Sequence, residues 1–298
     1  MKFLGLLNQY FKPLILVGSA LVYFLGVGLA RYLGSGVNWS SFGFGLGWIT
    51  ALQIGAFFLY EYFKPPELTD YSQNNNGRQG NPETRFSQRT VLLVAYTCMA
   101  VVASLTVLLI AERRSDPVIF LIMALLFTGC IFYSAPPFQL EFSGYGELVF
   151  AFMLGFLVPA FSFILQANQL HRLVAMTTFP LVFVSLAMFI ALQFPGFASA
   201  LKFDRRNLLI RMGWRRAMNL HNLLILGGYL LIGLASFFGL PSFVVIAAAL
   251  TLPFAILEIW QFYRIGQGGR PNWRLLSLNA LATFGSLAYL MAYSYWTH

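Results

Sequence analysis

Two short segments of the sequence hold the charged side chains best suited to bind an anionic ligand. Arg205, Arg206 and Arg211 form a basic cluster around Asn207, and Lys64 ends an apolar run far upstream. Guanidinium groups hold phosphate through charge-assisted hydrogen bonds, and a lysine ammonium pairs with phosphate as a point charge. These four basic residues are therefore candidate ligands of a phosphate group. A solvated basic loop, and a lysine that extends to a membrane interface, explain the same residues without any ligand.

Composition sets the class of protein. Hydrophobic residues make up 58% of the 298 residues and charged residues only 10%, whereas about a quarter of the residues of a soluble domain are charged. Apolar runs of about 20 residues, long enough to cross a bilayer, recur along the chain. Lipid offers no hydrogen-bond partner to backbone N–H and C=O groups, so these runs must be helices, which pair those groups internally. The sequence therefore predicts an all-α membrane domain over residues 1–298, with nine transmembrane helices near 13–32, 42–63, 90–111, 117–135, 145–166, 173–194, 220–239, 241–261 and 275–296.

The basic residues indicate how these helices are oriented. Of the 19 lysines and arginines, all except Arg31, Arg113, Arg114 and Arg172 fall on the side that carries the N-terminus. Because cytoplasmic loops carry the excess of Lys and Arg, we expect the N-terminus inside and the C-terminus outside. The net charge of +9 then reflects topology and does not indicate a nucleic-acid partner. The lipid bilayer is the expected partner, in a bacterial plasma membrane.

Two inward loops are long enough to contribute to a site. Residues 64–89 and 197–219 are much longer than the other connections, and long loops in compact domains are often functional. We expect these two loops to form a cytoplasmic cap over the bundle.

The second of these loops contains the most informative motif. Residues 192–213 read LQFPGFASALKFDRRNLLIRMG and resemble a cytoplasmic-loop motif of the UbiA prenyltransferase superfamily, roughly N-E-F-P-D-x-E-x-D-K-x-x-G-K-R-N/T-L-x-V-R-L-G. The alignment has no gap, and the matching residues include Phe194, Pro195, Arg206, Asn207, Leu208, Arg211 and Gly213. The family Asn falls on Leu192, and its two Asp residues fall on Gly196 and Ala200.

Two further segments resemble the same family. Residues 133–147, YSAPPFQLEFSGYGE, are similar to its Y-S/T-x-P-P-L-R-L…G-x-G-E signature, with Gln139 in place of Arg. Residues 59–64, LYEYFK, are similar to L-N-E-Y-F-D, with Tyr60 for Asn and Lys64 for Asp. The resemblance extends over nearly the whole chain and implies a UbiA-like bundle with a central cavity that opens to the cytoplasmic side.

The resemblance also implies a reaction, and it shows which of the residues required for that reaction are missing from this sequence. Members of the family transfer a prenyl group from a prenyl diphosphate to an aromatic or lipophilic acceptor, often in quinone biosynthesis. Mg²⁺ neutralises the leaving diphosphate, and carboxylates hold the metal. None of the corresponding positions is acidic here: Tyr60, Lys64, Leu192, Gly196 and Ala200. We therefore expect no catalytic residue, metal or other cofactor at these positions, and a protein that binds an isoprenoid or quinone-like lipid without turning it over.

Two alternatives remain open. An active prenyltransferase with relocated ligands would draw on other acidic residues, such as Glu61 or Asp204, and the candidate pocket residues are Glu61, Tyr133 and Asn207. Its diphosphate ligands would be Lys64 and the arginine cluster. A small-solute transporter is the second alternative, and the scarcity of ionisable residues inside the predicted spans argues against it.

The orientation can be tested by cysteine labelling. We expect cysteines introduced at Asn75 and Asn207 to be protected in intact cells from an impermeant thiol reagent, and one at His298 to react, because the charge distribution places only the last outside. The unsubstituted protein controls for Cys98 and Cys130. Labelling at Asn207 from outside would invert the predicted topology.

Overall fold

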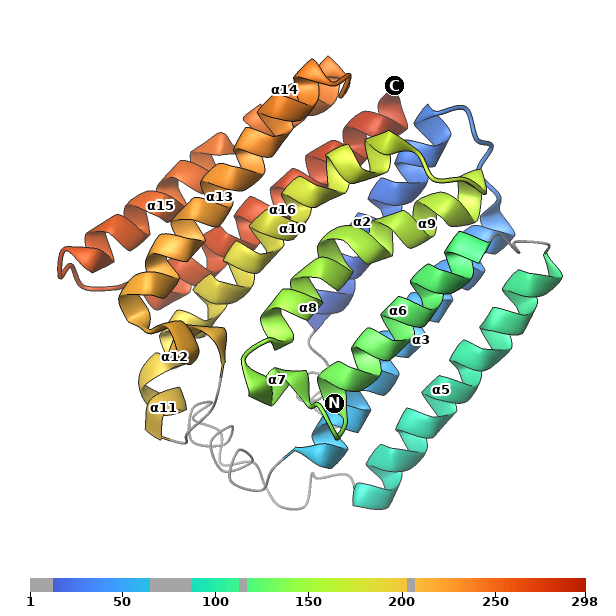
Figure 1. Cartoon of the computed structure of the whole chain (residues 1–298), viewed down its shortest axis with the longest axis horizontal. Coiled ribbons are helices and arrows are strands. Elements are labelled where there is room, and N and C mark those ends of the chain that lie inside the picture. Colours follow the sequence, from blue (N-terminus) through green and yellow to red (C-terminus); the bar gives the residue numbers. More distant parts are fainter. Residues whose placement is uncertain (1–12, 65–86, 113–116, 203–206) are drawn as a thin grey trace, which may run out of the picture.

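The computed structural model describes residues 13–64, 87–112, 117–202 and 207–298, which fold into a bundle of helices (Figure 1). Eight helical segments of this part of the chain are long and apolar enough to cross a membrane: α2 (Pro13–Tyr32), α3 (Trp39–Phe63), α5 (Gln88–Ala111), α6 (Pro117–Ser134), α8 to α9 (Gly146–Ala167), α10 with η3 (Arg172–Gly196), α13 (Trp214–Phe237) and α16 (Trp273–Thr297). The pair α14 (Ser242–Ala249) and α15 (Leu252–Gly266) gives a ninth span. The predicted all-α membrane bundle is confirmed.

The ninth of these spans is broken into two helices, whereas the sequence predicted one helix over 241–261. The axes of α14 and α15 differ by 41°. Pro253 has no backbone N–H and disfavours a helical residue before it, so α14 ends ahead of it. The Thr251 hydroxyl sits at the break, where it donates to the Ala248 carbonyl at 2.7 Å and lies 2.6 Å from the Tyr229 hydroxyl of α13.

The helix α13 also begins earlier than predicted. It starts at Trp214 rather than near residue 220, because the predicted boundary followed the apolar run while the helix continues through Arg215 and Arg216. Gly213 precedes it with a φ of 78°, a conformation that glycine adopts without strain. The helix therefore extends beyond the apolar run that crosses the bilayer.

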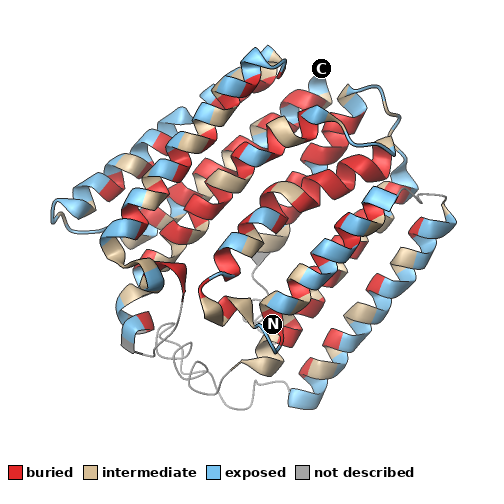
Figure 2. Ribbon diagram, in the orientation of Figure 1, coloured by how far each residue is buried: buried red, intermediate tan, exposed pale blue. Residues whose placement is uncertain are grey.

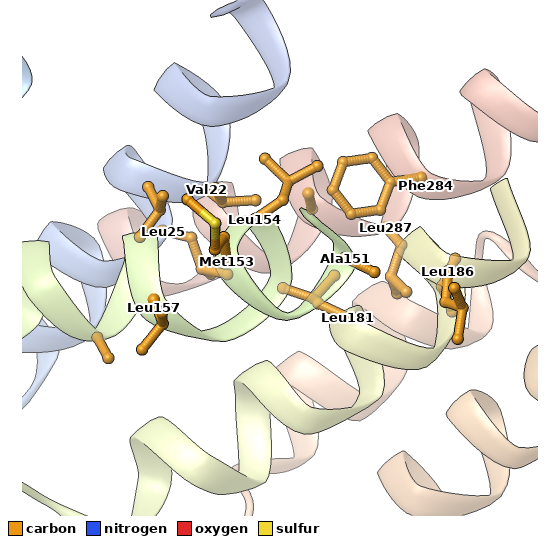
Figure 3. Close-up of a cluster of buried hydrophobic side chains, with 14 of the residues drawn as sticks. Val22, Leu25, Ala151, Met153, Leu154, Leu157, Leu181, Leu186, Phe284 and Leu287 are labelled. Carbon is orange, nitrogen blue, oxygen red and sulfur yellow. The ribbon is translucent and has the colours of Figure 1, made fainter. Parts of the chain in front are cut away.

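The core lies where α2, α8 with the π-helical turn η2 (Met153–Leu157), α10 and α16 meet. Figure 3 shows buried side chains from these elements: Val22, Leu25, Ala151, Met153, Leu154, Leu157, Leu181, Leu186, Phe284 and Leu287. Small residues let the helices approach closely. A Cβ at Gly26 would lie 2.1 Å from the Pro159 carbonyl oxygen, so α2 and α9 (Val158–Ala167) nearly touch there.

The outer surface of the bundle is apolar, as a lipid-facing shell requires. The helix α5 packs on α3 at one edge (Figure 1), and its Leu93 and Val107 are 62% and 64% exposed. Figure 2 shows exposed residues along the outer faces and buried residues towards the centre.

Three short helices gather at one end of the bundle. They are α7 (Leu140–Ser143), α11 (Phe197–Lys202) and α12 (Leu208–Met212), and they lie with the end of α3 and the start of α5 at the lower end in Figure 1. The C-terminus lies at the opposite end. Of the predicted cap, residues 88–89, 197–202, 208–212 and 214–219 are helical, and residues 65–86 and 203–206 fall outside the described chain.

The close approach at Gly26 predicts a stability effect. Gly26→Ala should lower the thermal unfolding temperature of the detergent-solubilised protein, because its methyl group forces α2 away from α9, and overpacking of this kind costs about 1–3 kcal/mol. The matched control is Gly233→Ala in α13, where a Cβ would meet no heavy atom within 4 Å. It should leave the unfolding temperature unchanged or raise it slightly, since Ala favours helix. Equal effects of the two substitutions would contradict the packing described.

Candidate ligand-binding site

A cavity of about 620 Å³ lies inside the described bundle and reaches the end that carries α7, α11 and α12. Its apolar walls come from α2, α8, η2, α10 and α16, and include Ile15, Leu21, Phe150, Met188, Leu281 and Phe284. The volume is in the range of small-molecule binding sites. An elongated apolar ligand fits such a lining.

Two glutamates lie at the polar end of this cavity. Glu141 and Glu147 both line it and are only 6% and 9% exposed. Tyr133 donates its hydroxyl hydrogen to Glu141 Oε2, and Gln193 donates from Nε2 to Glu147 Oε1. Both donors also line the cavity. The carboxylates are thus largely withdrawn from water and are held by neighbouring side chains.

Two amide side chains connect the cavity to the cap. Gln193 Oε1 accepts a hydrogen bond from the Leu209 backbone N–H, with 3.3 Å between N and O. Asn207 caps the N-terminus of α12, and its Oδ1 accepts from the Ile210 backbone N–H at 2.8 Å. Both interactions satisfy N–H groups in the first turn of α12, which have no partner within the helix. The polar end of the cavity is therefore anchored to α12.

The turn between α6 and α8 places the glutamates. Gln139 and Gly144 adopt left-handed conformations, with φ of 40° and 79°, and α7 lies between them. A Cβ at Gly146 would lie 2.8 Å from the Leu140 carbonyl oxygen, so only glycine fits the entry to α8. Glu147 follows at once in the first turn of α8, where the helix dipole favours a negative charge.

The residues at the end of α3 lie apart from the cavity lining. Lys64 Nζ is 3.6 Å from Glu61 Oε1 and 5.9 Å from the centre of the Tyr60 ring. The Tyr60 ring stacks on Phe142 of α7, with 5.5 Å between ring centres. Glu61, which the sequence suggested as a pocket residue, is engaged with Lys64 and does not line the cavity.

The second set of motif positions does line the cavity. Leu192, Gly196 and Ala200 come from α10, η3 and α11 and face the cavity together. Tyr133 and Asn207, the other suggested pocket residues, also line it. This part of the lining therefore offers an isobutyl group, a glycine and a methyl group.

The arginine cluster is only partly described. Arg211 Nη1 donates to the Ser143 carbonyl at 3.0 Å, and its guanidinium lies 4.3 Å from the centre of the Tyr145 ring. These contacts hold the turn before α8 against α12, and Arg211 is not a lining residue. Arg205 and Arg206, like Asp204, lie outside the described residues.

Sequence reasoning did not select Glu141, Glu147 or Gln193 as site residues. Glu147 stands in the G-x-G-E signature, but a helix start explains an acidic residue by itself. Glu141 becomes a cavity residue only because the turn around α7 carries it there. A signal was present in the sequence, since these two are the acidic residues closest to Tyr133 and its motif.

The carboxylates among the described lining residues come from one segment. Glu141 and Glu147 belong to α7 and α8, whereas the lining residues Leu192, Gly196 and Ala200 carry no carboxylate. Within the described chain, no group of three or more His, Cys, Asp or Glu residues is placed to hold a metal ion.

An ionisable pair lies elsewhere inside the bundle. His221 of α13 and Glu258 of α15 are fully buried, with 2.8 Å between Nε2 and Oε1. Glu258 lies in the middle of α15. Neither residue lines the cavity, so the pair does not mark a pathway through it.

Comparisons with known proteins identify the fold of the bundle. No family profile matches the sequence, and no curated protein matches it. A structure of digeranylgeranylglyceryl phosphate synthase superimposes with a TM-score of 0.68 at 9% identity, covering 99% of this chain and 100% of that one. A UbiA homologue from Archaeoglobus fulgidus, bound to GPP and Mg²⁺, superimposes with a TM-score of 0.59 at 13% identity, covering 94% and 99%.

The chain has the UbiA fold. The likeness extends over nearly the whole chain. At identities this low it concerns the fold alone, so the chemistry of the UbiA-type cavity has to be argued from the residues of this chain.

Proposed function

We propose that this chain is a divergent, multi-pass member of the UbiA prenyltransferase superfamily that binds an isoprenoid or quinone-like lipid without transferring a prenyl group. The single-domain organisation, the inward N-terminus and a bacterial plasma membrane location are parts of the same proposal. The observation that carries it is a retained apolar cavity whose wall at Leu192, Gly196 and Ala200 has no metal ligand.

Prenyl transfer needs more than a cavity. A leaving diphosphate carries several negative charges, and Mg²⁺ stabilises it by neutralising them and polarising the leaving oxygen. A clamp for such ions takes carboxylates from both sides of the diphosphate. At the second side this chain has aliphatic residues, and at the end of α3 it has Lys64 in an ion pair with Glu61. The apolar cavity remains suited to a prenyl chain.

A second candidate function is an active prenyltransferase with relocated ligands. Glu141 and Glu147 favour it, because both carboxylates line the cavity, and Mg²⁺ sites often use only one or two carboxylates together with phosphate oxygens. Against it, both carboxylates come from the segment of α7 and α8, and the lining residues Leu192, Gly196 and Ala200 add no further one.

Two assays on the purified protein test this proposal. Incubation with Mg²⁺, a radiolabelled prenyl diphosphate and a panel of aromatic quinone precursors should give no prenylated product. A tritiated isoprenoid lipid should nevertheless bind saturably. Gly285→Phe should abolish that binding, because Gly285 lines the cavity and a Cβ there points into open space. The matched control is Gly233→Phe, which places the same ring on α13 away from the cavity lining and should bind normally.

Turnover in the presence of Mg²⁺ would support the second candidate instead, provided that Glu141→Gln and Glu147→Gln abolish it. Binding that survives Gly285→Phe would show that the lipid lies elsewhere.

A further inference from the structure

The cavity has an apolar body and one polar end. The apolar walls come from the long helices, whereas Tyr133, Glu141, Glu147, Gln193 and Asn207 lie together at the end near α7 and α12. A lipid in this cavity places its chain among the apolar residues and its head group at these five side chains. The hydrogen-bonding capacity of the polar end therefore selects the head group.

Acceptors dominate that end. An ionised carboxylate accepts hydrogen bonds at about four positions, so Glu141 and Glu147 can each accept from a ligand as well as from a neighbouring side chain. The nearby donors are already directed at them, since the Tyr133 hydroxyl donates to Glu141 and the Gln193 amide donates to Glu147.

Asn207 brings an amide donor to the polar end. Its side chain is 4% exposed and lines the cavity, and its Oδ1 accepts a hydrogen bond from the Ile210 backbone N–H. Because the oxygen caps α12, the Nδ2 amide is the part of this side chain that can donate to a ligand oxygen.

We propose that the polar end selects a lipid whose head group is a hydroxyl, which donates to Glu141 or Glu147 and accepts from the Asn207 amide. This inference rests on the proposed lipid-binding function and specifies its ligand. A hydroxyl is the simplest group that both donates and accepts. Prenyl alcohols and prenylated hydroquinones share this chemistry.

A diphosphate has the opposite character. It only accepts hydrogen bonds and it is an anion, so it would meet two carboxylates and one amide donor among the described lining residues. A site that hydrogen-bonds a ligand hydroxyl also discriminates strongly against an analogue without one, because the buried polar groups are left unpaired. Selectivity should therefore depend on the donor hydrogen.

Equilibrium binding to the full-length protein tests this in the absence of metal with five probes: farnesol, farnesyl methyl ether, farnesyl diphosphate, a farnesylated hydroquinone and the corresponding quinone. Farnesol should bind about 10–100-fold more tightly than its methyl ether, the range expected for a lost hydrogen bond to a charged group. It should bind at least about tenfold more tightly than the diphosphate. The hydroxyl can come from a prenyl alcohol or from a prenylated hydroquinone. Tighter binding of the hydroquinone than of its quinone would point to the second source.

Variants test whether the preference for farnesol over its methyl ether arises in the cavity. Glu141→Gln and Glu147→Gln together keep the shape and remove the charge, so the preference for farnesol over its ether should fall about tenfold. Glu61→Gln removes a carboxylate that does not line the cavity and should leave the preference unchanged.

Equal binding of alcohol and ether, or metal-free binding of the diphosphate as tight as that of farnesol, would overturn the head-group assignment while leaving lipid binding intact. The diphosphate measurement is then repeated with Mg²⁺, and binding that appears only with Mg²⁺ and is lost in the double glutamate variant would overturn the assignment in favour of a relocated metal site. If no probe binds, the proposed function itself fails.

Discussion

Two carboxylates buried at the end of an apolar cavity impose the strongest constraint on this bundle. A charged group withdrawn from water is costly unless it is paired or hydrogen-bonded. Glu141 and Glu147 meet this requirement through Tyr133 of α6 and Gln193 of α10. Gln193 also accepts from the backbone of α12. These bonds tie α6, the turn at α7, α10 and the cap together, so the shape of the cavity end depends on them.

The same bundle can support different chemistry at this end. The fold needs the apolar shell, the close contact of α2 with α9 at Gly26, and the tight turn at Gly144 and Gly146. None of these features requires a metal ligand. A chain can therefore keep a UbiA-type cavity while the residues facing it change, which is why function has to be argued from the site rather than from the fold.

The sequence predicted the spans well because lipid restricts a crossing segment to a long apolar helix. It missed the bend at Pro253 and the early start of α13, since apolar runs do not show where a helix breaks inside them or continues past them. The motif positions Leu192, Gly196 and Ala200 line the cavity. Glu147 and His221 could not be assigned from the sequence, because their hydrogen-bond partners Gln193 and Glu258 come from helices distant in sequence. Arg205 and Arg206 stay predictions.

The claim that this cavity lacks a metal clamp is tested most directly with Mn²⁺, which takes oxygen ligands much as Mg²⁺ does and gives an electron paramagnetic resonance signal when free. Purified protein is titrated with Mn²⁺ and GPP, and the free signal is compared with that of GPP alone. We predict the same free Mn²⁺ with and without protein, and no change in Glu147→Gln. A stoichiometric protein-bound fraction that disappears in Glu147→Gln would contradict the claim.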